Sequence, residues 1–170
     1  MITKAYMDGL PDVRRAGSGL TFCGKAGLGK TFLAQMVLKD AQEKGYKVES
    51  LTVSTFVLMQ QKLFNRHEDE DLLMAIERQI ERIQYQTDFV LFDDVGREYD
   101  SERGFASQTL FNVIRDRTNR RLPFLVTTNM TMDGLERRYS DSFVSLLYGK
   151  THVVELEGVD YRRAAGTDRD

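Results

Sequence analysis

Residues 24–31 read GKAGLGKT, and they match the pattern G-x-x-x-x-G-K-[ST] at every fixed position. Glycines in such a loop let the backbone turn tightly, so that its N–H groups can approach phosphate oxygens that a Cβ atom would block. Lys30 would bring a positive charge to the β- and γ-phosphates, and the Thr31 hydroxyl can bind Mg²⁺. The pattern predicts binding of a nucleoside triphosphate. The expected phosphate contacts are Gly24, Ala26, Gly27, Leu28, Gly29, Lys30, Thr31 and Phe32.

The segments on either side of this loop have the patterns that a phosphate site needs. Residues 20–24 (LTFCG) form a short apolar run that is typical of a buried strand. After Gly29, the apolar residues Phe32, Leu33, Met36 and Val37 recur at helical spacing. The loop is therefore expected to join a strand to the N-terminus of a helix, where the helix dipole favours anions.

The composition narrows the class of protein. A chain of 170 residues with 41% apolar and 29% charged residues is expected to form one soluble domain. No apolar run approaches the roughly 20 residues of a membrane span, and no signal pattern opens the chain, so we expect no membrane contact and a cytoplasmic location. The single cysteine excludes a disulfide framework, and two histidines make a zinc site improbable. The net charge of −2 leaves DNA binding to a local basic patch.

A second functional stretch, residues 88–94, reads DFVLFDD. Its continuous apolar run predicts a central parallel strand that is buried on both faces. The two carboxylates that follow are expected beside the phosphates, because ligands of open α/β sheets lie at the carboxyl ends of the strands. Asp93 would hold Mg²⁺ through water, and Asp94 would position or deprotonate the attacking water. Together with the phosphate loop, the stretch is interpreted as a Walker B element.

A third strand end carries an amide side chain. Residues 123–128 (PFLVTT) predict another buried strand, which ends at Asn129. An amide there can hydrogen-bond both the γ-phosphate and the attacking water, the role of a sensor. Alternatively, Asn129 caps the helix that follows it.

The remaining pattern predicts a three-layer α/β sandwich. Five strands are expected near residues 20, 47, 89, 124 and 152, with helices at 54–66, 69–85, 106–121 and 133–139 that make parallel crossovers. Residues 95–105 predict a mobile loop over the site. The domain division is an irregular lead-in at 1–18, the nucleotide-binding domain at 19–163 and a disordered tail at 164–170.

Basic residues gather at the end of the helix expected at 106–121. They are Arg115, Arg117, Arg120 and Arg121. Such a cluster is usually a solvated face. The alternative is a contact with a neighbouring subunit or with a nucleic-acid backbone.

Four segments, GKAGLGKTFLA, LFDDVG, LPFLVTTNM and ELEGVDYRR, together resemble the AAA+ ATPase domain of the DnaC/DnaI-type replicative helicase loaders. Transposition helper ATPases of the IstB type share most of this pattern. The resemblance covers about residues 5–163. It implies a P-loop NTPase sandwich with a five-stranded parallel sheet, an AAA+ core without a C-terminal lid domain. The implied cofactors are ATP and Mg²⁺. The implied partners are the replicative helicase and single-stranded DNA, with ATP-dependent self-association.

The resemblance also implies roles for individual residues. Lys30, Asp93, Asp94 and Asn129 would be catalytic, with Thr31 and Asp93 at the metal. Arg162, in the D-Y-R ending, resembles a second nucleotide sensor. The helical insertion at residues 54–85 falls where loaders carry an element that faces DNA. This makes Phe56, Lys62 and Arg66 the candidate DNA contacts.

Two departures from the family pattern affect these expectations. The chain leaves no room before the phosphate loop for the N-terminal domain with which loaders grip the helicase, so we expect a short form or an excised domain. In addition, Leu146 stands where the arginine finger is expected, and Ser142 stands at the earlier arginine. An arginine finger contributes ~10³–10⁵ in turnover, so hydrolysis is expected to be slow unless Arg117, Arg137 or Arg138 replaces it.

Three functional hypotheses follow. The first is an ATPase domain that loads a replicative helicase on single-stranded DNA. The second is a nucleotide-gated adaptor or decoy that binds ATP and scarcely hydrolyses it. The third is a transposition helper ATPase that forms ATP-dependent filaments on duplex DNA.

Overall fold

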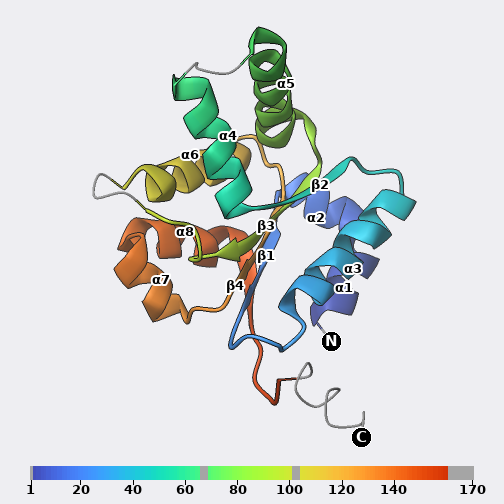
Figure 1. Cartoon of the computed structure of the whole chain (residues 1–170). Coiled ribbons are helices and arrows are strands. Elements are labelled where there is room, and N and C mark those ends of the chain that lie inside the picture. The colour runs from blue at the N-terminus through green and yellow to red at the C-terminus, as the bar shows by residue number, and fades with distance from the viewer. Residues whose placement is uncertain (1, 66–68, 101–103, 161–170) are drawn as a thin grey trace, which may run out of the picture.

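The computed structural model describes residues 2–65, 69–100 and 104–160, and Figure 1 shows their arrangement around one parallel sheet. The strands are β1 (Gly19–Cys23), β2 (Val48–Thr52), β3 (Phe89–Val95), β4 (Phe124–Thr128) and β5 (Thr151–Glu155). Their order in the sheet is β2-β3-β4-β1-β5, and every neighbouring pair is parallel. The predicted five-stranded parallel sheet of an α/β sandwich is thus confirmed.

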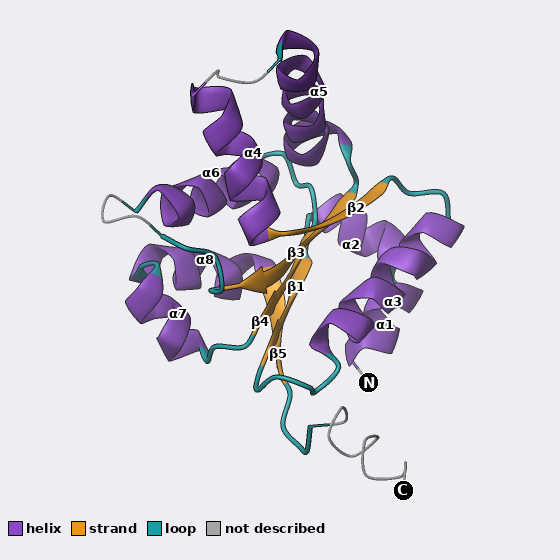
Figure 2. Cartoon of the chain, viewed as in Figure 1, coloured by secondary structure: helices purple, strands orange, loops and turns teal. Residues whose placement is uncertain are grey.

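Helices cover both faces of this sheet (Figure 2). On one side lie α1 (Ile2–Asp8), α2 (Leu10–Ala16) and α3 (Lys30–Glu43). On the other lie α4 (Val53–Asn65), α5 (Glu70–Glu81), α6 (Phe105–Asn119), α7 (Met132–Arg138) and α8 (Asp141–Lys150), with a π-helical turn at Arg82–Gln86. Alternate side chains of β3 enter the two cores: Phe89 packs with the α1–α3 side, and Phe92 with the other.

The N-terminal segment differs from the irregular lead-in that the sequence predicted. It forms two short helices that belong to the core, with Tyr6 and Leu10 buried. The Tyr6 hydroxyl donates to the Ser18 carbonyl at 2.7 Å. Pro11 stands in the first turn of α2, where its fixed φ favours a helix start and costs no hydrogen bond. Pro11 therefore opens a helix within a segment that was expected to be irregular.

Helix α8 is absent from the sequence-based prediction. Its start is capped by Ser140, whose hydroxyl accepts the Phe143 N–H at 3.1 Å. Phe143, Val144 and Leu147 are buried on one side of the helix. The helix is ten residues long and follows α7 closely, so its helical period is hard to separate from that of the preceding helix.

Arg115, Arg120 and Arg121 are exposed, as on a solvated face, but Arg117 departs from both interpretations of the basic cluster. It is completely buried, although it was expected on a solvated face or at an interface. Its guanidinium donates to the carbonyl oxygens of Thr87 at 3.0 Å, Asp88 at 3.2 Å and Pro123 at 2.7 Å, and to that of Ile83. These carbonyls lie in the π-helical turn and loops that leave backbone acceptors without regular partners. Burial lowers the pKa of Arg117 to about 9, which still leaves it charged at neutral pH.

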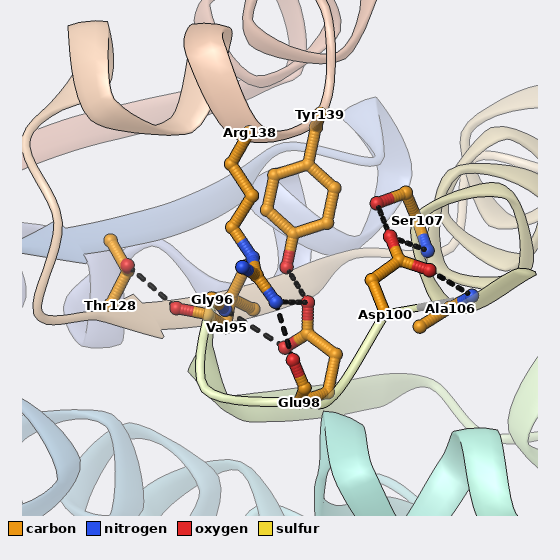
Figure 3. A network of polar contacts seen from close by, with 9 residues as sticks. All are labelled: Val95, Gly96, Glu98, Asp100, Ala106, Ser107, Thr128, Arg138 and Tyr139. Atoms are coloured by element: carbon orange, nitrogen blue, oxygen red, sulfur yellow. Dashed lines mark hydrogen bonds and ion pairs between the residues drawn. The ribbon is translucent and has the colours of Figure 1, made fainter. Parts of the chain in front are cut away.

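The segment after β3 also differs from the mobile loop that was predicted. Glu98 is buried with only 3% of its surface exposed, and Asp100 accepts hydrogen bonds from the N–H groups of Ala106 and Ser107 at 3.0 and 3.2 Å. Figure 3 shows both carboxylates pointing into the fold from this segment. Residues 95–100 are therefore fixed. Residues 101–103 lie outside the described residues.

A candidate nucleotide-binding site

The phosphate loop crosses from β1 to α3 with a backbone that only glycine adopts easily. Gly24 and Gly27 have φ values of 134° and 80°. A Cβ atom on Gly24 would lie 2.3 Å from the Leu156 carbonyl oxygen, and one on Gly27 would lie 1.8 Å from Asp160 Oδ1. The segment that follows β5 therefore packs against the loop, and side chains at these two positions are excluded.

The loop forms one wall of a cleft of about 770 Å³. Residues from the ends of β3 and β4 form the opposite wall. The lining residues are Ala26, Gly27, Leu28, Gly29, Lys30, Thr31, Phe32, Leu33, Asp93, Asp94, Arg97, Asn129 and Leu156. The sequence-predicted loop, carboxylates and amide thus share one cavity.

Lys30 lies under the loop, and only 6% of it is exposed. Its Nζ donates to the carbonyl oxygens of Gly24 and Lys25 at 2.8 and 2.7 Å. The ammonium group is therefore held at the mouth of the loop by backbone acceptors. An anion in the loop would compete with those carbonyls for the same donor.

Thr31 and Asp93 lie in direct contact. The Thr31 hydroxyl donates to Asp93 Oδ1 at 2.9 Å, and the Thr127 hydroxyl donates to the same oxygen. Hydroxyl and carboxylate oxygens are the hard ligands that Mg²⁺ prefers. Within the part of the chain that the structure describes, no group of three acidic, histidine or cysteine side chains could hold a metal by itself.

Asp94 occupies a strained position at the end of β3. Its φ is 57°, and the register between β3 and β4 shifts between Phe92 and Val95, as in a β-bulge. The bulge turns the Asp94 carboxylate toward the cleft, where Oδ2 lies 3.4 Å from Arg97 Nη1. Sequence reasoning missed Arg97. The sequence did contain a signal for it: the glycine of VGR, directly after the two carboxylates, indicates a turn that keeps the next residue near the strand end.

Asn129 directly follows β4 and lines the cleft. The capping alternative for this residue is wrong, because Thr131 caps α7: its hydroxyl accepts the Gly134 N–H at 3.1 Å. Asn129 also lines a neighbouring pocket of about 410 Å³, as do Cys23 and Glu155. Burial, with a smaller effect of Glu155, raises the pKa of Cys23 to about 11, so the thiol stays protonated at neutral pH.

Comparisons with known proteins now decide the family. The sequence pattern of the family described as IstB-like ATP binding protein matches residues 9–167. The chain belongs to the IstB-like ATP-binding protein family. It is 27% identical over 126 residues to the replicative helicase loader DnaI of Bacillus subtilis (strain 168), which is 74% of this chain. The chain spans 38% of the length of that relative.

Solved structures agree on the fold of this IstB-like domain. The crystal structure of the DnaC helicase loader superposes with a TM-score of 0.75 at 21% identity, covering 92% of this chain and 86% of that chain. AMPPCP-bound DnaA from Aquifex aeolicus superposes with a TM-score of 0.70 at 22% identity, covering 93% of this chain and 47% of that chain. The similarity to DnaC and DnaA concerns the fold.

The structure separates the three candidate DNA contacts. Phe56 is completely buried and meets Phe92 edge-on at 6.0 Å between ring centroids, so the prediction that it contacts DNA is wrong. Lys62 is half-buried on α4, and Arg66 lies outside the described residues. Phe64, the next-to-last residue of α4, is 83% exposed and is the aromatic side chain of this helix that solvent reaches.

The three arginines named as possible replacements for the arginine finger lie in different environments. Arg117 is buried and donates to backbone carbonyls, and Arg138 is paired with Glu98. Neither side chain is therefore available to a neighbouring subunit. Arg137 is exposed on α7, outside the cleft. Leu146 is half-buried against the core on α8. Arg162 lies outside the described residues.

Among the residues that the structure describes, no helix is long and apolar enough to cross a membrane.

Proposed function

We propose that this IstB-like domain is the ATPase domain of a DnaC/DnaI-type helicase loader. It binds ATP with Mg²⁺ in the cytoplasm and couples binding and hydrolysis to the loading of a replicative helicase on single-stranded DNA. The observation that carries the proposal is the contact of Thr31 with Asp93 inside the cleft that also holds Lys30 and Asn129. The names of the DnaI and DnaC relatives support the choice of helicase and DNA as partners.

Binding uses groups that are already in place. Lys30 exchanges its backbone acceptors for β- and γ-phosphate oxygens. Thr31 and Asp93 would hold Mg²⁺, directly or through water, and the ion would supply positive charge that neutralises the phosphates. The loop N–H groups and the α3 N-terminus receive the remaining phosphate oxygens.

Hydrolysis then requires an oriented water. The Asn129 amide holds this water in line with the γ-phosphorus, and Asp94 accepts its proton as the new P–O bond forms. The bond between the γ-phosphorus and the bridging oxygen breaks, and its electron pair stays on the β-phosphate of ADP. Inorganic phosphate leaves, and Asp94 returns the proton to solvent.

Substitution of Lys30 tests the phosphate site. Lys30→Ala is expected to abolish ATP binding in calorimetry, and Lys39→Ala provides the matched control. Lys39 lies on the same helix but is exposed, and its ion pair with Glu43 is long at 3.9 Å. Unchanged ATP affinity in Lys30→Ala would refute the assignment. Turnover with and without single-stranded DNA then tests the loader role, which requires hydrolysis that DNA stimulates.

A nucleotide-gated adaptor is the second candidate. The apolar Leu146, packed against the core at the expected finger position, favours it. Tight ATP binding with negligible turnover, with or without DNA, would support the adaptor function.

A transposition helper ATPase is the third candidate, and the family match favours it. ATP-dependent filaments on duplex DNA in electron microscopy would select it over the loader.

A further inference from the structure

Arg97 lines the nucleotide cleft from the turn after β3. Its side chain is 68% exposed, and Nη1 lies 3.4 Å from Asp94 Oδ2. Among the described residues, it is the one arginine that lines the cleft. A guanidinium next to the carboxylate that faces the attacking water stands where negative charge increases during phosphoryl transfer.

Hydrogen bonds hold the backbone around Arg97 on both sides, whereas its side chain is 68% exposed and pairs with Asp94. Before it, the Val95 carbonyl accepts the Thr128 hydroxyl at 2.7 Å, and the Gly96 N–H donates to Glu98 Oε2 at 2.9 Å. The Arg97 N–H itself donates to the Asp94 carbonyl at 3.2 Å. The turn is thus preorganised, and reorienting the side chain requires no change of backbone.

The residue after Arg97 is the anchor of this turn (Figure 3). Glu98 is buried, and it receives hydrogen bonds from the Tyr139 hydroxyl and from Arg138. Arg138 also donates to the Glu98 carbonyl. These contacts fasten the turn to α7. Arg97 consequently projects from a rigid base into the cleft.

Other arginines are worse placed for this role. Arg117 is buried and Arg138 is committed to Glu98. Arg137 borders a separate hollow with the acidic residues Asp133, Glu136 and Asp141, so its nearest charges are carboxylates of its own surface.

We propose that Arg97 acts within its own chain as the arginine that stabilises the γ-phosphoryl group in the transition state. This inference rests on the proposed ATPase function. Without nucleotide, Arg97 pairs with Asp94. With ATP bound, the guanidinium moves to the γ-phosphate oxygens and releases Asp94 to accept the proton of the attacking water. The bond changes are those of hydrolysis: a P–O bond to water forms, the bond to the bridging oxygen breaks, and ADP keeps the electron pair.

Binding of ADP with aluminium fluoride, a mimic of the transferred phosphoryl group, tests the proposal without relying on turnover. The full chain, Arg97→Ala and Arg97→Lys are titrated with Mg²⁺·ADP, with and without aluminium fluoride. Arg78→Ala, an exposed arginine on α5, is the matched control. We expect equal ADP affinity in all four proteins. Aluminium fluoride should tighten binding in the full chain and Arg78→Ala, and this gain should fall at least about tenfold in Arg97→Ala.

Turnover adds a second readout. Arg97→Ala should lower kcat by about 10³ or more, with Arg97→Lys between it and the full chain. Turnover per chain should not change on dilution, because the arginine comes from the same chain. Arg137→Ala should leave kcat unchanged.

The outcomes separate the two levels of the proposal. If the full chain does not bind ADP more tightly than Lys30→Ala does, the proposed function fails. If ADP binds normally but aluminium fluoride tightens Arg97→Ala as much as the full chain, or tightens neither, the role of Arg97 is overturned. It is also overturned if turnover rises with chain concentration and Arg137→Ala abolishes it.

Discussion

Glu98 and Arg138 form an ion pair inside the fold: Arg138 Nη2 lies 3.4 Å from Glu98 Oε1, and the Glu98 side chain is only 1% exposed. The pair joins the turn after β3 to α7. Tyr139 donates to the same carboxylate oxygen, and its own pKa is raised by burial and by this bond. The buried ion pair therefore connects the segment after β3 with the helix that follows β4, and these two strands carry the candidate catalytic residues at their ends.

Removal of the Glu98 carboxylate should destabilise the fold strongly. Glu98→Ala leaves Arg138 and Tyr139 without their acceptor, and we expect a loss of about 3 kcal/mol in the free energy of unfolding. Urea denaturation measures it. Tyr139→Phe removes a single hydrogen bond and should cost about 1 kcal/mol. A loss below that of Tyr139→Phe would show that the pair is not structural.

Arg117 should be essential to stability and irrelevant to intermolecular contacts. Arg117→Ala leaves four buried backbone carbonyls without a donor, so we expect a loss of about 3–5 kcal/mol in thermal or urea unfolding. Arg115→Ala, at an exposed position of the same helix, should change stability by less than about 0.5 kcal/mol. Wild-type stability in Arg117→Ala would contradict the buried geometry.

Asp93 should determine the response to Mg²⁺. In Asp93→Asn the amide can still contact Thr31 and Thr127, but the charge that attracts the metal is gone. ATP affinity measured in EDTA should stay the same, while the gain on adding Mg²⁺ should shrink by about tenfold or more. Asp94→Asn serves as the comparison and should keep the full Mg²⁺ gain. Equal Mg²⁺ gains in both variants would remove Asp93 from the metal site.

Phe56 and Phe64 should give opposite results. Phe56→Ala opens a cavity in the core and should cost about 3–5 kcal/mol of stability. Phe64→Ala, which is 83% exposed in wild type, should leave stability unchanged. If the tip of α4 faces single-stranded DNA, fluorescence anisotropy should show weaker binding for Phe64→Ala, because stacking on an aromatic side chain contributes about 1–3 kcal/mol per base.

The thiol of Cys23 should react slowly in the native protein. Its pKa is raised by burial to about 11, so the folded state holds its proton more tightly than the unfolded state does. The contribution to stability is therefore fully present below the ordinary pKa of about 9, and it is lost as the pH rises toward 11. Alkylation by iodoacetamide at pH 8 should be slow in buffer and fast in denaturant. Equal rates would show an accessible thiolate.

Local patterns account for the predictable part of this protein. The glycine spacing of residues 24–31 and the run DFVLFDD fix a loop and a strand by themselves, and parallel strands bring their carboxyl ends together. The proximity of Thr31 and Asp93 follows from these rules. The grouping of Asn129 in the same cleft follows in the same way.

The residues that sequence reasoning misplaced depend on partners far along the chain. Arg117 is buried where its guanidinium meets carbonyls about 30 positions earlier, and no local period reveals this contact. Glu98 lies in a polar stretch, where the sequence alone gives it the pattern of a solvated acid. Its burial depends on Arg138 and Tyr139, some 40 positions later. The pairing of Arg97 with Asp94 arises from a positive φ that the letters DDVGR do not dictate.

Thr127 is a single side chain that serves both neighbouring acids. Its hydroxyl donates to Asp93 and accepts the Asp94 N–H at 3.0 Å. A hydroxyl carries one proton, so donation to Asp93 leaves only its lone pairs to face Asp94. Both acids belong to β3, so the neighbouring strand β4 holds the Asp93 carboxylate and the Asp94 backbone through one hydroxyl. A change of that one hydroxyl would therefore remove a contact from the proposed metal ligand and from the backbone of the proposed base at once.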